Sequence, residues 1–454
     1  MRPDSSRVVL MAGILALALG APGSASQAAE SSSLKLSGSI RIRQESLDGQ
    51  YRPGFDDKDD MLALRSSVMA EWTQGDWKLV GELSDSRAYD TDSGSVLTAN
   101  EVNALEPVQA YVRRDFVSPF GKGSSATVQV GRMLVNLGSR RLVASDEFRN
   151  TPQGSTGIRT DLRFANKAQW VAFYLMPQQR RPDDFASLRD NEIALDHEGG
   201  DLRLWGMMAA RPGLLPGDTL GEITYVRLQE DDHGARATRN RNLHTISVRA
   251  IRDPKAGQGD FEIEGIVQSG HIRASTAANA TTLDVNAWFL HADAGYTFQT
   301  TGRPRLSAEF DYVSGDGPSA SYQRFDTLFG MRRPDLAPSG IYGAVGRANL
   351  QSLGLRLEAA PSARVDVLGT YRLLWAADRH DSFSTSGIRD ASGASGSFAG
   401  QQLDGRVRYW IVPQKLRAEV NAVWLLRGGL LRNAPNASPH GDTHYLSAAL
   451  TLTY

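Results

Sequence analysis

The chain has 454 residues and no cysteine, which excludes structural disulfides and thiol chemistry. Its 50 lysines and arginines nearly balance 51 aspartates and glutamates, and the resulting net charge of -1 gives no support for a nucleic-acid partner. A mean hydropathy of -0.34 argues against a bundle of membrane-spanning helices. No apolar run after residue 30 approaches the roughly 20 residues that such a helix needs.

The first residues have the pattern of a secretory signal peptide. Arg2 and Arg7 precede a short apolar run over residues 8–19, and small residues such as Ala28 and Ala29 follow as a cleavage site. We therefore predict a signal peptide over residues 1–29 and one mature domain over residues 30–454.

From residue 34 onward, short segments alternate apolar and polar residues, which is the pattern of β-strands with one apolar face. The final segment alternates up to the last residue, as expected for a barrel strand that pairs with the first strand. The alternation predicts eighteen strands, at residues 34–43, 62–72, 77–87, 105–116, 126–135, 156–164, 167–176, 202–210, 220–229, 243–252, 261–270, 285–298, 305–313, 349–359, 365–375, 402–410, 416–426 and 445–454.

The connections alternate between short turns and long polar loops, such as residues 314–347 and 378–400. Counting the segment 191–197 as a strand would make the number odd, whereas bacterial single-chain barrels have an even number, so we assign it to a loop. Sixteen strands is the alternative, because residues 170–175 and 222–228 alternate poorly. The predicted fold class is all-β: a transmembrane antiparallel β-barrel with long extracellular loops and short periplasmic turns.

The strand faces opposite the apolar ones carry many arginines and few lysines. Arginine binds carboxylates and phosphates through a planar fork and keeps its charge in most environments. Such side chains would guide an anionic solute, and neighbouring acids would keep its binding weak enough for release. The alternative for each arginine is an ion pair that braces the wall. Alternation places inward Arg41, Arg43, Arg65, Arg113, Arg159, Arg163, Arg249, Arg356, Arg372, Arg406 and Arg408, with the acids Glu82, Asp161, Glu309 and Asp404.

Several short motifs resemble, in kind and order, those of the alginate export family of outer-membrane proteins. They lie at residues 81–88, 131–132, 138–141, 148–151, 157–159, 325–330, 340–343 and 403–405. The resemblance covers almost the whole mature chain and implies an 18-stranded barrel with a narrow, arginine-rich passage for a polyuronate. The resemblance also implies that six arginines form the constriction of the passage: Arg87, Arg132, Arg140, Arg141, Arg149 and Arg159. Strict alternation turns Arg132 toward lipid, so its place in this set requires a bulge near Gly131.

These features predict an outer-membrane channel that passes an anionic polysaccharide or sugar-acid solute by diffusion and uses no cofactor. An uptake porin for small organic acids or oligosaccharides is the alternative within transport. A barrel enzyme is the alternative from another class, and His291 is the main histidine expected on an inward face. Residues 90–101 bear a faint likeness to a calcium loop, but we expect no metal site. Expected partners are outer-membrane lipid and lipopolysaccharide of a Gram-negative bacterium, the solute, and periplasmic export or uptake proteins; we expect a monomer.

Overall fold

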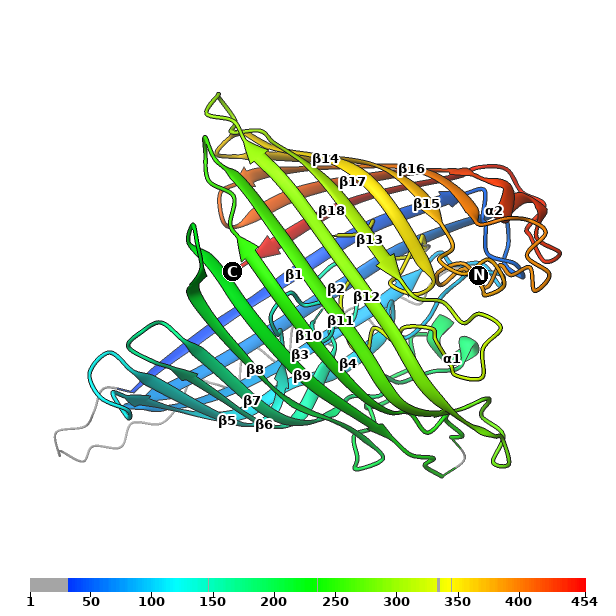
Figure 1. The fold of residues 1–454 in the computed structure, drawn as a ribbon. Helices are drawn as coiled ribbons and strands as arrows, with labels where there is room; N and C mark the ends of the chain where they lie inside the picture. The colour runs from blue at the N-terminus through cyan, green and yellow to red at the C-terminus, as the bar shows by residue number, and fades with distance from the viewer. Residues whose placement is uncertain (1–31, 146, 235, 333–334, 344) are drawn as a thin grey trace, which may run out of the picture.

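The computed structural model describes residues 32–454, apart from residues 146, 235, 333–334 and 344. The predicted signal peptide lies outside the described residues. Eighteen antiparallel strands form one closed sheet, in which each strand pairs with its neighbours in sequence and β1 also pairs with β18 (Figure 1). The predicted 18-stranded barrel is therefore confirmed, and the sixteen-stranded alternative is wrong.

Each predicted strand is present, and the segment 191–197 lies in a loop, as predicted. Many strands continue beyond their predicted ends at the long-loop rim, where they leave the apolar band and the alternation fades. Two short helices, α1 (Phe185–Arg189) and α2 (Gly429–Asn433), lie in loops. Within the described ranges, no helix is long and apolar enough to cross a membrane. The strands are β1 (Ser33–Asp48), β2 (Lys58–Gln74), β3 (Trp77–Tyr89), β4 (Asn103–Val117), β5 (Ser125–Leu134), β6 (Gly154–Arg163), β7 (Gln169–Pro177), β8 (Leu202–Leu215), β9 (Thr219–Glu230), β10 (Asn242–Arg252), β11 (Gly259–Arg273), β12 (Thr282–Thr297), β13 (Arg305–Val313), β14 (Leu350–Ser362), β15 (Val365–Trp375), β16 (Phe398–Val412), β17 (Leu416–Arg427) and β18 (Thr443–Thr453).

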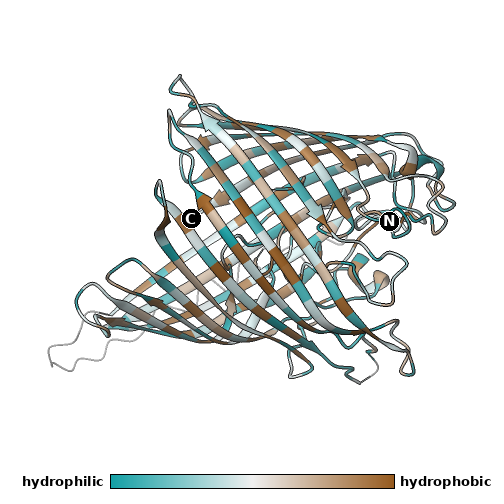
Figure 2. Cartoon of the chain, viewed as in Figure 1, coloured by the Kyte–Doolittle hydropathy of each residue, from teal (hydrophilic) through white to brown (hydrophobic). Residues whose placement is uncertain are grey.

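The barrel closes between its first and last strands. The β1–β18 ladder runs from Ser39 opposite Thr453 to Asp48 opposite His444. Along these two strands the outward leucines and isoleucines are between 42% and 62% exposed. They alternate with inward residues, of which Arg41, Arg43, Glu45 and Ser447 are buried. Figure 2 shows the alternation of hydrophobic and hydrophilic residues along the strands of the barrel. Exposed apolar rows of this kind meet hydrocarbon, and closure leaves no unpaired strand edge in the membrane.

The two rims differ in their connections. One rim has turns such as residues 75–76, 363–364 and 413–415, and the chain end at Tyr454 lies there as well (Figure 1). The other rim has the long loops, including residues 178–201 and 376–397. This asymmetry is that of an outer-membrane barrel with short periplasmic turns and long extracellular loops.

Two long loops turn back into the barrel: residues 135–153, between β5 and β6, and residues 314–349, between β13 and β14. They pair with each other through a parallel bridge between Val143 and Phe329. The second loop also packs against the wall, because the Tyr342 ring lies 5.7 Å from the Tyr445 ring of β18. We call these two segments the inserted loops. They narrow the lumen and bring loop arginines close to the arginines of the wall.

Candidate solute pathway

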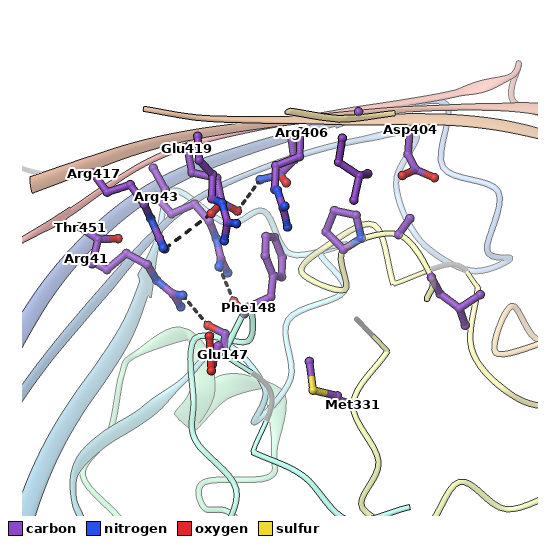
Figure 3. Close-up of a pocket in the computed structure, with 18 of the residues that line it drawn as sticks. Arg41, Arg43, Glu147, Phe148, Met331, Asp404, Arg406, Arg417, Glu419 and Thr451 are labelled. Atoms are coloured by element: carbon purple, nitrogen blue, oxygen red, sulfur yellow. Dashed lines mark hydrogen bonds and ion pairs between the residues drawn. The ribbon is translucent and has the colours of Figure 1, made fainter. Parts of the chain in front are cut away.

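A cavity of about 250 Å³ lies between the tips of the inserted loops and the wall formed by β1 and β14–β18 (Figure 3). It reaches toward the short-turn rim, and we call it the periplasmic-side cavity. Seven arginines and three carboxylates line it, so arginine predominates among the charged residues at its surface. They are Arg41, Arg43, Arg140, Arg356, Arg406, Arg408 and Arg417, with Glu147, Asp404 and Glu419.

The two arginines of β1 mainly hold the first inserted loop. Arg41 donates from Nη1 to the carbonyl oxygen of Glu147 at 2.8 Å and from Nη2 to that of Arg149 at 2.7 Å. Arg43 donates to the carbonyl oxygen of Phe148, lies 4.2 Å from the centre of the Phe148 ring, and pairs with Glu45 at 2.6 Å. Both guanidinium groups are buried. They therefore fix where the loop tip sits in the lumen.

Other arginines of this cavity keep accessible guanidinium groups. Arg406 and Arg408 share the Asp366 carboxylate at 3.2 and 2.8 Å, and their side chains are 18% and 31% exposed. Arg417 lies 3.6 Å from Glu419. Arg140, at the loop tip, is 44% exposed and only 3.9 Å from Glu147, which is itself 84% exposed. A solute carboxylate can reach these partly neutralised cations without displacing a buried structure.

Arg141 fastens both inserted loops to the wall. Its Nη1 donates to Glu262 at 2.5 Å and to Glu264 at 2.6 Å, and its Nε donates to Asp335 at 2.7 Å. Burial alone lowers the pKa of the Arg141 guanidinium, but these carboxylates raise it well above its usual value. Burial alone raises the pKa of Asp335, but Arg141 and Arg347 lower it well below its usual value. We call these contacts the Arg141–Asp335 lock.

A second basic region lies beyond the inserted loops, toward the long-loop rim. A cavity of about 260 Å³ is lined there by four arginines and one carboxylate: Arg149, Arg324, Arg332 and Arg347, with Asp326. It shares Tyr322 and Asp326 with a neighbouring cavity of about 350 Å³. That neighbour adds Arg236, Arg239 and Arg241, together with Glu230. Basic cavities thus lie on both sides of the inserted loops.

The remaining predicted residues lie in the wall, most of them in ion pairs or hydrogen bonds. Arg356 and Arg372 both pair with Glu309, Arg249 pairs with Glu262, Arg159 with Asp161, and Arg113 with Asp115. Arg65 donates to the carbonyl oxygen of Arg149 at 3.4 Å, Glu82 accepts from Gln109 at 2.5 Å, and Asp404 accepts from Gln402 at 3.0 Å. Arg163 ends β6, opposite Ser125 and Gln169. Their roles in solute passage stay predictions.

Arg87 and Arg132 require a correction. Residues directly opposite each other in a ladder share a face, and Arg87 lies opposite the outward Leu64, whereas Arg132 lies opposite the outward Ala110. No bulge interrupts β5 at Gly131, which instead allows a close approach: a Cβ there would meet the Ala110 carbonyl oxygen at 2.3 Å. The predicted inward turn of Arg132 is therefore wrong.

Both of these arginines have structural partners. Arg87 pairs with Asp85 at 3.0 Å, and Arg132 pairs with Glu106 at 2.5 Å and with Glu198 of the loop 178–201. They fasten that loop and the bulged edge of β4 to the wall. In the two motifs at residues 81–88 and 131–132, these arginines therefore hold structural contacts outside the lumen.

Two other hypotheses can be compared with the geometry. His291 Nδ1 lies 2.8 Å from Asp311, and Ser352 Oγ donates to the other oxygen of the same aspartate at 3.2 Å. The aspartate thus lies between the serine and the histidine. This order differs from that of an activated nucleophile, in which the histidine contacts the hydroxyl group directly. In the segment resembling a calcium loop, Glu101 accepts from the backbone and hydroxyl of Thr98, so its carboxylate is used within the loop.

Solved structures that are similar to this barrel include outer-membrane proteins of Pseudomonas aeruginosa. OccK9 (OpdG) is 14% identical, with a TM-score of 0.54 over 92% of this chain and 98% of that one. The outer-membrane protein OpdK is 10% identical, with a TM-score of 0.56 over 92% and 99%. OccK2 (OpdF), in complex with glucuronate, is 13% identical, with a TM-score of 0.51 over 92% and 96%. At these identities the likeness shows the fold alone. No curated protein matches the chain.

The family comparison covers almost all of the described chain. A family model described as "Alginate export" matches residues 32–443, from the first strand to the start of the last. Together with the closed 18-stranded barrel, this places the protein in the outer membrane of a Gram-negative bacterium as a β-barrel of the channel type. The chain belongs to the alginate export family.

Proposed function

We propose that the barrel is a diffusion channel for an anionic solute of the polyuronate or sugar-acid class, with no catalytic step. The observation that carries this proposal is the lining of the periplasmic-side cavity, with seven arginines against three carboxylates. A water-filled passage with low-dielectric walls concentrates ions of the opposite charge. The shared carboxylates weaken each arginine's hold on a solute, as conduction requires.

Membership of the alginate export family supports a polyuronate or its fragments as the solute. An uptake porin for small organic acids or oligosaccharides is the second candidate, and the narrow lumen favours it, because the inserted loops are held by buried contacts. Two structural neighbours agree with small carboxylates, since OpdK was solved with vanillate and OccK2 with glucuronate. Both candidates require recognition of a carboxylate by arginine.

The test reverses the charge of one accessible arginine on each side of the inserted loops. Arg140 lines the periplasmic-side cavity and Arg149 lines a cavity on the other side. Changing both to glutamate shifts the local charge by about four units, and unit charges about 4 Å apart interact by roughly 1–4 kcal/mol. Anion preference in planar bilayers should therefore fall sharply or reverse, and added polyuronate or glucuronate should no longer block the small-ion current.

The matched control reverses Arg379 and Arg389, which are exposed in the loop 376–397. Charges there are screened over about 8 Å at physiological salt, so the reversal potential should stay near that of the parent. If Arg140→Glu/Arg149→Glu leaves selectivity unchanged in a folded barrel, the arginines are braces and the proposal fails. Block by long polyuronates but not by small acids would favour the polymer, and the opposite result would favour the uptake porin. Lipid or ester hydrolysis without stepwise conductance would support the barrel enzyme.

A further inference from the structure

Three side chains that can bind a metal ion meet at the long-loop rim. His197 and Asp201 lie near the end of the loop between β7 and β8, and His233 lies in the loop between β9 and β10. One ligand atom from each residue lies within 4.8 Å of the other two. None of the three lines the basic cavities described above. The channel function leaves this cluster unexplained.

Surrounding contacts hold the three residues in place. His197 Nε2 lies 3.1 Å from one oxygen of Asp201, and the rings of His197 and His233 stack with their centres 4.7 Å apart. The other oxygen of Asp201 accepts a hydrogen bond from Gln179 Nε2 at 2.8 Å. The backbone of Gln179 also exchanges two hydrogen bonds with that of His197, at 2.9 and 3.1 Å. One residue thus orients both ligands of the first loop.

A backbone contact joins the second loop to the first. The amide of Asp231 donates to the carbonyl oxygen of Asp201 at 2.8 Å, two residues before His233. His233 itself exchanges backbone hydrogen bonds with Arg236 at 3.1 and 2.9 Å, which closes a tight turn. The turn is exposed at His233, so an ion can reach the site directly from the external solution.

The chemistry of the three groups suits a cation. Asp201 offers a carboxylate oxygen, and the two imidazole rings each offer a ring nitrogen. Neutral imidazole and ionised carboxylate are the forms that coordinate metals.

We propose that His197, Asp201 and His233 form a binding site for Zn²⁺ or a similar borderline divalent ion, open to the outside of the cell. Two nitrogens and one oxygen with a free fourth position for water fit zinc, whereas Mg²⁺ and Ca²⁺ prefer oxygen ligands throughout. Bonds of about 2.0–2.1 Å set tetrahedral ligand atoms about 3.3 Å apart. The His197–Asp201 pair, at 3.1 Å, is close to this spacing, and the ligand atom of His233 would move by at most about 1.5 Å to reach it. The ion takes the place of the proton between His197 Nε2 and Asp201, and the neutral imidazole of His197 then carries its proton on Nδ1.

Bound zinc would cross-link two extracellular loops. The bridged turn ends at Arg236, which lines a basic cavity together with Arg239 and Arg241. Zinc should therefore order the loop that forms one edge of the external basic region. Binding itself is independent of whether the barrel conducts anions, so failure of one proposal does not decide the other.

The test is isothermal titration of ZnCl₂ into the purified full-length barrel, in detergent, after chelator treatment. We expect one zinc ion per chain and no comparable binding of MgCl₂. His197→Ala and His233→Ala should each weaken zinc binding by more than about 100-fold, and Gln179→Ala, which removes only an outer partner, by about 10–100-fold. The control is His271→Ala. His271 pairs with Asp284 at 2.9 Å in an exposed site outside the proposed cluster. The His271→Ala variant should therefore bind zinc as the parent does.

A second measurement uses the unmutated barrel and so does not depend on the folding of variants. Zinc should protect His197 and His233 from carbethoxylation, read by mass spectrometry, and should leave His271 reactive. The proposal is overturned if the parent binds no zinc, if His197→Ala/His233→Ala in a heat-modifiable barrel binds it as well as the parent, or if zinc protects His271 equally.

Discussion

Removing the charge of Asp335 should open the lumen. Its carboxylate binds Arg141 at 2.7 and 3.0 Å and also pairs with Arg347, and all three side chains are at most 7% exposed. Asp335→Asn keeps the shape of the side chain but leaves two buried guanidinium groups with one fewer counter-charge. Breaking a buried ion pair on one side costs roughly 3–5 kcal/mol.

This energy acts on the inserted loops, because Asp335 lies in one of them and Arg141 in the other. If the closed arrangement loses about 3 kcal/mol or more, the ratio of closed to open loops falls by a factor of about 100, since each 1.4 kcal/mol is tenfold. Single-channel recordings in planar bilayers should show a larger mean conductance and frequent transitions between levels. The parent should show a smaller and steadier conductance.

Asp161→Asn is the matched control for this change. Asp161 pairs with Arg159 at 2.7 Å on β6 and is 38% exposed, and the contacts described for it involve neither inserted loop. Its loss should leave conductance and its fluctuations close to those of the parent. Unchanged recordings for Asp335→Asn would refute the reasoning and would mean that other contacts, such as the Val143–Phe329 bridge, hold the loops without the lock.

Three further outcomes are expected. The pKa of Asp335 is depressed below its ordinary value of 3.8, so the stability that the lock contributes is complete above pH 3.8 and is lost only as the pH falls below that value. The conductance should therefore be the same at pH 7 and pH 5 and should rise below about pH 4. A rise in conductance already at pH 5 would contradict this. Deleting residues 450–454 removes the pairing of β18 with Ile40 and Ile42 and leaves an unpaired strand edge, which is costly in hydrocarbon. No heat-modifiable barrel should then reach the outer membrane, and normal assembly would refute the closure argument. An epitope inserted at Gly387, which is exposed in a long loop, should be labelled on intact cells, whereas one within the turn 413–415 should need permeabilised cells, and the reverse pattern would overturn the orientation.

Much of the fold followed from local pattern. A strand has a side-chain period of two, and each strand of a membrane barrel must turn one face to lipid, so alternation alone located the strands. The alternation up to Tyr454 predicted that the last strand pairs with the first, and the ladder from Ser39 to Asp48 confirms it. The same rule placed Arg41 and Arg43 on the inner face of β1, because neighbouring residues of a strand point to opposite faces and Ile40 and Ile42 point outward.

What the side chains bind was decided only by the tertiary structure. The Arg41 side chain donates hydrogen bonds to the carbonyl oxygens of residues 147 and 149, more than a hundred residues away in the chain. The Arg141 side chain donates to a carboxylate of β11 and to Asp335. His197 and His233 meet because the backbone of Asp231 reaches that of Asp201. Periodicity fixes the face of a strand, but the inserted loops have no period, and their course depends on contacts between segments far apart in the chain. The sequence therefore determined the barrel and which residues its inner faces carry, and the packing of the loops determined the partners of the arginines on those faces.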